Sequence, residues 1–205
     1  MNKRNVLRMM AGGAAWAGLA ATLGLAACSK EAAKPSFNAI DITGADYARD
    51  FSLKDADGKV RTLADFKGKV VVLFFGYAQC PDVCPTTMTE MAQVKQQLGS
   101  DADKLQVVFV TVDPARDTPE VLKAYMGAFD PAFVALIPTP EQLAATAKDF
   151  KVYYKKVDGK TPTSYSMDHS AASFVYDTEG RLRLYARYGT GVAPMVADVK
   201  ALLQS

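Results

Sequence analysis

The stretch Lys69-Val-Val-Val-Leu-Phe-Phe-Gly-Tyr-Ala-Gln-Cys-Pro-Asp-Val-Cys-Pro85 decides the fold. Its unbroken apolar run fits a central strand that is buried on both faces. Apolar residues then recur at helical spacing over residues 85–98, and Gly99 is a suitable residue to end that helix. A buried strand that leads through two cysteines into a helix indicates an α/β domain, with its chemistry at the carboxyl end of the sheet.

The segments on either side predict the rest of the domain. Capping residues before proline open two helices, and turn residues separate the arms of two β-hairpins. The predicted elements are a hairpin at 51–54 and 59–63, strands at 69–75 and 105–112, helices at 119–129 and 140–150, a hairpin at 173–177 and 181–187, and a helix at 193–203. This order predicts a mixed central sheet with helices on both faces. It is the pattern of a thioredoxin-like fold with an added N-terminal β-hairpin and an extra inserted helix.

The N-terminal residues have the layout of an export signal. Residues 1–8 carry three basic side chains and no acidic one, and residues 9–27 are apolar and uncharged. The end of this stretch, Leu25-Ala-Ala-Cys28, resembles a bacterial lipobox, in which the cysteine is lipidated. We therefore predict a lipoprotein signal peptide at 1–27, lipidation of Cys28, a tether at 28–37 and the folded domain at 38–205. An uncleaved transmembrane anchor is the alternative. Both interpretations place the domain outside the cytoplasm and at a membrane, with the lipid-anchored domain facing the periplasm.

The charge pattern excludes one class of partner. The whole chain has 24 Lys and Arg residues against 22 Asp and Glu residues, and the predicted signal holds only basic ones. The remainder is close to neutral, and its basic residues are scattered along the chain. Because nucleic-acid binding requires a basic excess that is clustered, the sequence predicts no nucleic-acid partner.

If Cys28 carries lipid, Cys80 and Cys84 are the remaining thiols. A structural disulfide between them is one alternative, although so small a loop would gain little stability. Since each cysteine precedes a proline, we expect Cys84 to be the N-cap of the helix, Pro85 its first residue, and Cys80 to lie on the preceding loop. The helix N-terminus would then lower the pKa of a thiol. Thiolates serve both metal binding and disulfide exchange, so the spacing alone leaves both open.

His169 is the only histidine of the chain. It lies in a predicted loop directly before the closing hairpin, and in a thioredoxin-like fold that loop faces the cysteine loop. Ordinary thioredoxins have a cis-proline there, whereas this sequence has no proline between Pro162 and Pro194. An imidazole that faces two thiolates forms a set of three ligands that suits Cu(I), while a structural zinc site requires four. A histidine with a purely structural place on the surface or in the core is the alternative.

Three motifs resemble those of the Sco/SenC family of copper-delivery proteins. They are Cys80-Pro-Asp-Val-Cys84-Pro, Thr111-Val-Asp-Pro-Ala-Arg-Asp-Thr-Pro119 and Asp168-His169-Ser170. The resemblance extends over the domain from about Phe51 onward. It implies a copper chaperone for the binuclear copper centre of cytochrome c oxidase, with one copper ion, Cu(I) or Cu(II), held by Cys80, Cys84 and His169. The implied partner is the copper-bearing subunit of the oxidase, and a periplasmic copper donor is a further expected partner.

The thiols must be reduced to bind copper, so a Cys80–Cys84 disulfide would be the metal-free form. Four charged residues near the motifs have two interpretations each. Asp113, Arg116 and Asp117 either cap a helix and form a local ion pair, or support the site from behind the ligands. Asp168 either orients the imidazole through its ring N–H or shapes the turn.

Two enzymatic alternatives remain, and whether the protein is an enzyme stays open. A thiol–disulfide oxidoreductase that reduces cysteines of an assembling oxidase ranks second. Against it stand the CxxxC spacing in place of CxxC, and a histidine where a proline is expected. A peroxidase ranks third, because it requires a base or an arginine beside one thiolate and the sequence does not show which arginine would serve.

Overall fold

The computed structural model describes residues 36–161 and 164–205. The predicted signal peptide (1–27), the lipidation site Cys28 and most of the predicted tether (28–37) lie outside these residues. Within the two described ranges, no helix is both long and apolar enough to span a bilayer.

An eight-stranded mixed sheet forms the centre of the domain, with the strand order β1-β10-β9-β4-β5-β6-β2-β3. Strands β4, β5 and β6 are parallel to one another, and every other neighbouring pair is antiparallel. The strands are β1 (Ile40–Asp41), β2 (Leu53–Asp55), β3 (Val60–Arg61), β4 (Val70–Gly76), β5 (Leu105–Thr111), β6 (Val134–Ile137), β9 (Ser173–Tyr176) and β10 (Leu182–Ala186). The predicted fold class is confirmed, including the hairpin of β2 and β3 at one edge of the sheet.

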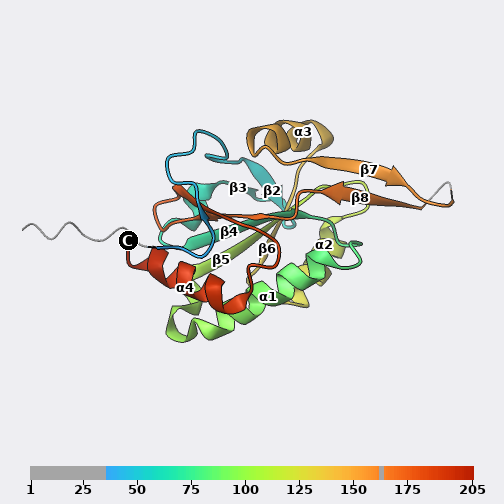
Figure 1. Cartoon of the computed structure of the whole chain (residues 1–205). Helices are drawn as coiled ribbons and strands as arrows, with labels where there is room; N and C mark the ends of the chain where they lie inside the picture. The colour runs from blue at the N-terminus through green and yellow to red at the C-terminus, as the bar shows by residue number, and fades with distance from the viewer. Residues whose placement is uncertain (1–35, 162–163) are drawn as a thin grey trace, which may run out of the picture. The chain divides into compact units, whose positions relative to one another are not determined.

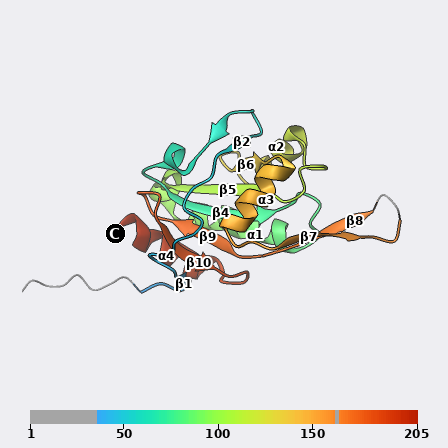
Figure 2. The same ribbon diagram turned by 90° about the horizontal axis from the view of Figure 1, so that it is seen from above.

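Helices cover both faces of this sheet (Figures 1 and 2). They are α1 (Val83–Gln97), α2 (Pro119–Gly127), α3 (Pro140–Asp149) and α4 (Val192–Leu203), with short 3-10 turns at Leu63–Phe66 and Gly99–Lys104. Helix α3 lies on the opposite side of the sheet from α1 and α4 (Figure 1). Thr118 and Thr139 cap α2 and α3, and each is followed by a proline at the first helical position, as the sequence predicts.

The core consists of the two central strands and the aromatic side chains on either side of them. Every residue of β4 and β5 is buried, as expected for strands between two helical layers. On one face, the ring of Phe75 contacts the rings of Phe150, at the end of α3, and Phe174. On the other face, Phe74 packs against Phe109. This packing fixes the carboxyl end of β4, from which the cysteine loop departs.

The sequence does not predict a second, two-stranded sheet of β7 (Tyr154–Asp158) and β8 (Tyr165–His169). Its strands pair in antiparallel register, with Tyr154 opposite His169, and the hairpin extends away from the main sheet in both views (Figures 1 and 2). The expectation that His169 lies in a loop is therefore wrong, because it is the last residue of β8. The short edge strand β1, which pairs with β10, is also absent from the prediction.

The predicted start of the cysteine helix is also wrong. Helix α1 begins at Val83, so Cys84 lies inside its first turn and is not the N-cap. A proline at position 85 is compatible with this, since the N–H groups of the first turn have no intrahelical acceptor and none is lost. The preference of a residue before proline for extended backbone is here outweighed by the burial of Cys84, which is completely inaccessible.

Candidate metal centre

Two parts of the chain that are distant in the sequence, the segment with both cysteines and the end of β8, meet beyond the carboxyl end of β4. The loop after β4 carries Cys80, the first turn of α1 carries Cys84, and the end of β8 carries His169. Their donor atoms, two Sγ atoms and one imidazole nitrogen, all lie within 4.8 Å of one another. The structure thus brings together the three side chains that the sequence singles out, and a small rearrangement would place all three around one ion.

The hydrogen-bond partners of Cys84 and His169 show which of their atoms carry protons. His169 Nδ1 lies 2.9 Å from the carbonyl oxygen of Ser170, which can only accept, so Nδ1 carries the ring proton and donates it. His169 Nε2, 3.4 Å from Cys84 Sγ, is then free to accept the thiol proton. Burial lowers the pKa of His169 and raises the pKa of Cys84, which keeps both side chains neutral in this arrangement.

The expectation that the helix N-terminus lowers the pKa of a thiol is therefore wrong for Cys84. Its sulfur is completely buried, and the cost of placing a charge there outweighs the favourable end of the helix. The helix N-terminus instead contacts the other cysteine, since the backbone N–H of Cys84 donates a hydrogen bond to Cys80 Sγ at 3.4 Å. Cys80 is also the more accessible of the two. The pair therefore consists of one shielded sulfur and one that reaches the surface.

Both cysteines in the described part of the chain are free thiols. The predicted Cys80–Cys84 disulfide accordingly remains a prediction about an oxidised form. Aromatic side chains enclose the third donor, since the rings of Phe74 and Tyr77 each stand edge-on to the imidazole with centroids 5.9 Å away. These contacts restrict the rotation of the imidazole and hold Nε2 toward the sulfurs.

Asp117 and Arg116 support the cysteine loop from behind the donor atoms. The carboxylate of Asp117 is completely buried and accepts hydrogen bonds from the hydroxyl of Thr111, at 2.6 Å, and from the backbone N–H of Ala78, at 3.1 Å. Burial raises the pKa of Asp117. Arg116 Nη1 donates to the side-chain oxygen of Gln79 in the same loop. The motif after β5 thus holds the cysteine loop in place.

The remaining two predicted neighbours have different positions. Asp113 pairs with Arg116, which is the local ion pair that the sequence allows. Asp168 is exposed, and the ring N–H of His169 that it could have oriented is directed at the carbonyl oxygen of Ser170. The structure therefore does not support an orienting role through that N–H, and Asp168 lies within strand β8 and not in a turn. The sequence does not single out Tyr77, the first residue after β4, although its ring contacts the imidazole of His169.

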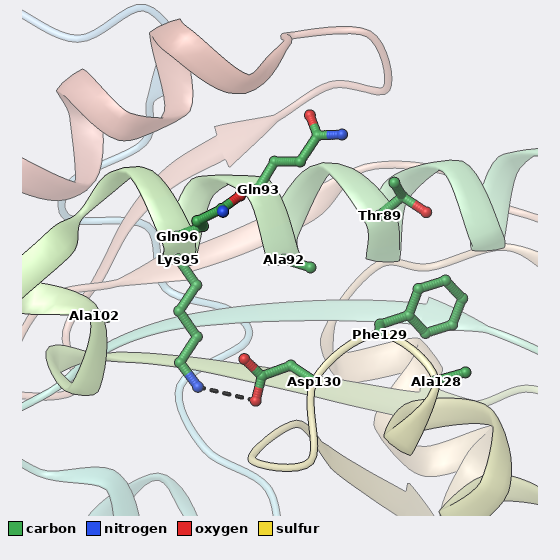
Figure 3. A pocket seen from close by; sticks show the side chains of 9 residues that line it. All are labelled: Thr89, Ala92, Gln93, Lys95, Gln96, Ala102, Ala128, Phe129 and Asp130. Atoms are coloured by element: carbon green, nitrogen blue, oxygen red, sulfur yellow. Dashed lines mark hydrogen bonds and ion pairs between the residues drawn. The ribbon is translucent and has the colours of Figure 1, made fainter.

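A separate hollow lies between α1 and the loop after α2 (Figure 3). Its charged side chains, Lys95 and Asp130, form an ion pair of 3.0 Å and neutralise each other. The other side chains that line it are small, amide, hydroxyl or aromatic: Thr89, Ala92, Gln93, Gln96, Ala102, Ala128 and Phe129. None of these is a thiol or an imidazole, so this hollow lacks the donors of the site above.

Two sulfurs and an imidazole nitrogen suit a soft or borderline metal ion, and three donors without a fourth favour a site of low coordination number. The profile of the SCO1/SenC family matches residues 41–204, which includes all three donor residues. The chain belongs to the SCO1/SenC family.

Relatives within the SCO1/SenC family include both sequences and solved structures. A SCO2-like protein of Rickettsia felis is 35% identical over 133 residues, which cover 64% of this chain and 65% of the relative. The chain thus aligns with slightly less than two thirds of that relative's length. The structure of Bradyrhizobium japonicum ScoI with copper bound has 39% sequence identity and a TM-score of 0.66, covering 74% of this chain and 95% of that one. A SCO1/SenC family lipoprotein from Bacillus anthracis has 26% identity and a TM-score of 0.64, covering 75% and 92%.

Proposed function

We propose that this SCO1/SenC protein is a metallochaperone that binds one copper ion and delivers it to the binuclear copper centre of cytochrome c oxidase during assembly of that enzyme. The observation that carries the proposal is the convergence of Cys80, Cys84 and His169, whose donor atoms lie within 4.8 Å of one another. The copper-bound state of the related ScoI supports the choice of metal.

The geometry suits a metal that is held and then passed on. Cys84 Sγ and His169 Nε2 are already in contact, so copper would replace the thiol proton between them and bind to both. Cys80 supplies the third donor from the accessible side of the site. Because few ligands hold the ion and both Cys80 and His169 are only partly buried, an incoming ligand of a partner can replace one of them while Cys84 still holds the ion.

The same two cysteines provide a redox control in this proposal. Oxidation of Cys80 and Cys84 to a disulfide removes two of the three ligands, so the oxidised form cannot hold copper. The partners are the copper-bearing subunit of the oxidase and a periplasmic protein that supplies the copper. The domain is exported and held at a membrane by lipid on Cys28, which the existence of a SCO1/SenC family lipoprotein supports.

A second candidate function is thiol–disulfide exchange with cysteines of the oxidase. Cys80 favours it, since its sulfur is the more accessible of the two and accepts a hydrogen bond from the backbone N–H of Cys84. Cys84, in contrast, is buried with a raised pKa and resembles a ligand more than a resolving nucleophile. Against the peroxidase alternative, Arg116 Nε and Nη1 are engaged with Asp113 and Gln79, although its Nη2 is buried without a hydrogen-bond partner among the described residues.

The experiment that tests the proposal is a titration of the reduced, full-length protein in detergent with Cu(I), in competition with a chromophoric Cu(I) chelator. We expect one tight equivalent, and a loss of affinity of at least tenfold in His169→Ala. The matched control is Ser166→Ala, an exposed residue of the same strand, which should bind as tightly as the unmodified protein. If His169→Ala keeps full copper affinity while disulfide exchange proceeds at the normal rate, the oxidoreductase is the correct function.

A further inference from the structure

Arg116 joins the two segments that carry the copper ligands. Its Nη1 donates to the side-chain oxygen of Gln79, one residue before Cys80, at 3.1 Å. The same Nη1 donates to the backbone carbonyl of Tyr165, the first residue of β8, at 2.9 Å. One guanidinium nitrogen therefore bridges the cysteine loop and the strand that ends in His169.

Further contacts fix the guanidinium between these segments. Its central carbon lies 3.5 Å from the centroid of the Tyr165 ring, which is close stacking. Arg116 Nε donates to one carboxylate oxygen of Asp113, and the hydroxyl of Tyr165 donates to the other at 2.9 Å. Asp113 is buried and Arg116 is only 18% exposed, so the ion pair is largely shielded from solvent. Arginine, carboxylate and phenol thus contact one another at the start of β8, while Arg116 Nη2 is buried without a hydrogen-bond partner in the part of the chain that the structure describes.

The hairpin that carries His169 has few other attachments to the core. Of the five residues of β7 none is buried, and of the five of β8 only Met167 is. Tyr165 and His169 are four residues apart on one strand, so their side chains point to the same face and their Cα atoms are separated by roughly 13 Å. We expect a displacement of β8 at Tyr165 to reach His169, because the pairing of β8 with β7 is continuous from Tyr165 to His169.

We propose that Arg116 is a positioning residue for copper binding: it fixes β8 against the cysteine loop and so keeps the imidazole nitrogen of His169 within 4.8 Å of both sulfurs, close enough to share one ion with them. Arg116 touches none of the three donors and acts through Tyr165 and Gln79. A lysine would keep the charge, but it cannot stack on Tyr165 and bridge two acceptors with one planar group. This inference rests on the proposed copper function.

A double-mutant cycle with Arg116→Gln and His169→Ala tests the inference, with Cu(I) affinity of the reduced full-length protein as the readout. We expect Arg116→Gln to weaken copper binding about tenfold, the lower end of the range for residues that orient metal ligands. In the His169→Ala background the same substitution should change the affinity less than twofold, because no imidazole remains to be positioned. Arg116→Lys should behave like Arg116→Gln.

The control is Arg61→Gln, which breaks another arginine–carboxylate pair, Arg61 with Asp55 at 2.7 Å, and should leave copper affinity unchanged. A second readout is the electron paramagnetic resonance spectrum of the Cu(II)-loaded protein, in which the nitrogen hyperfine coupling of the imidazole should weaken in Arg116→Gln. If Arg116→Gln does not fold, Tyr165→Leu removes the stacking surface and replaces it in the cycle.

An equal loss of affinity in both backgrounds would show that Arg116 acts on the dithiol or on the fold, and would overturn the inference. Unchanged affinity in Arg116→Gln, or full affinity in Arg116→Lys, would overturn it as well. Failure of the proposed function is a different result: the unmodified protein and His169→Ala would then bind copper equally, before Arg116 is changed at all.

Discussion

The substitution Gly76→Ala tests whether the space beside Cys84 is as restricted as the structure shows. Gly76 is the last residue of β4 and lies directly before the cysteine loop. A Cβ atom at this position would lie 2.9 Å from Cys84 Sγ and 2.8 Å from ring carbons of both Phe74 and Phe109. Real Cβ atoms essentially never have contacts this short, so at least one neighbour must move.

We expect Gly76→Ala to lower the unfolding free energy, because the neighbouring side chains have no free space to move into. Both phenylalanines and Cys84 are completely buried, and each is held by close packing on its other sides. Overpacking of this kind destabilises a protein by about 1–3 kcal/mol. Alanine also lowers the conformational entropy of the unfolded chain, and this effect stabilises the folded protein by about 0.4–1 kcal/mol at most. We therefore expect a net loss of about 1–2 kcal/mol, which corresponds to a melting temperature roughly 2–8 °C lower for a domain of this size.

Thermal unfolding of the reduced protein, followed by circular dichroism, measures this change. The matched control is Gly127→Ala at the end of α2, where an added Cβ has no neighbour within 4 Å and should leave the melting temperature unchanged or slightly higher. Copper affinity should fall in Gly76→Ala alone, because Cys84 Sγ is the nearest sulfur to the added atom. Equal melting temperatures and equal copper affinities for the two variants would refute the packing described here.

Three further changes have defined outcomes. Burial alone would raise the pKa of Asp177, but hydrogen bonds from Arg181 and Arg183 outweigh it and hold the pKa below its usual value. The stabilisation by Asp177 is hence complete above the unfolded-state pKa of about 4 and is lost as the pH falls further. In urea unfolding, Asp177→Asn should have an unfolding free energy about 1–3 kcal/mol lower than the unmodified protein at pH 7, and this difference should shrink by pH 3. A difference that is independent of pH would contradict this. Asp198→Ala removes the acceptor of the backbone N–H groups of residues 38 and 39 and should lower the unfolding free energy by about 2 kcal/mol. Hydrogen exchange should become faster at those two amides, and unchanged exchange would refute this role of Asp198. Cys28→Ser should move the protein from the detergent phase to the aqueous phase in a phase-separation assay, whereas continued partition with detergent would indicate an uncleaved anchor.

The parts of the fold that the sequence predicts are those in which local pattern and burial agree. The apolar runs at residues 69–75 and 105–112 are buried on both faces and correspond to β4 and β5 within one residue. The threonine–proline pairs mark the starts of α2 and α3 because capping and the proline ring act within a single turn. Such features depend on near neighbours, so the sequence contains the information.

The β7–β8 hairpin is missed for the opposite reason. Its strands are largely exposed, and β7 carries Lys155 and Lys156, so its residues do not alternate between apolar and polar. Strand β8 does alternate, with Met167 between Ser166 and Asp168, but one buried side chain in five residues is a weak signal. What stabilises the hairpin is Arg116, more than forty residues away, through contacts with Tyr165 that no local pattern encodes. The convergence of His169 with the cysteines could be predicted from the expected fold, but the strand that delivers it could not.

The error over the thiol pKa has a general cause. A helix N-terminus stabilises a nearby negative charge by about 1 kcal/mol at most sites, whereas complete burial of a charged group in a core costs several times as much. Cys84 lies in the first turn of α1 yet is inaccessible, so the larger effect determines its pKa. Position in the helix can be read from the sequence, but burial depends on Phe74 and Phe109 packing above Gly76.

The hydrogen bonds of Cys84 and His169 explain how the site is stable without a metal ion. A buried thiol and a partly buried imidazole would each be costly without a partner, but the thiol proton shared with His169 Nε2 and the contact of Nδ1 with Ser170 satisfy both. In the proposed copper function, metal binding would replace this hydrogen bond with bonds from Cys84 and His169 to the ion and would release a proton. The proposed copper carrier would benefit from this arrangement, because a partner can reach Cys80 while Cys84 stays buried.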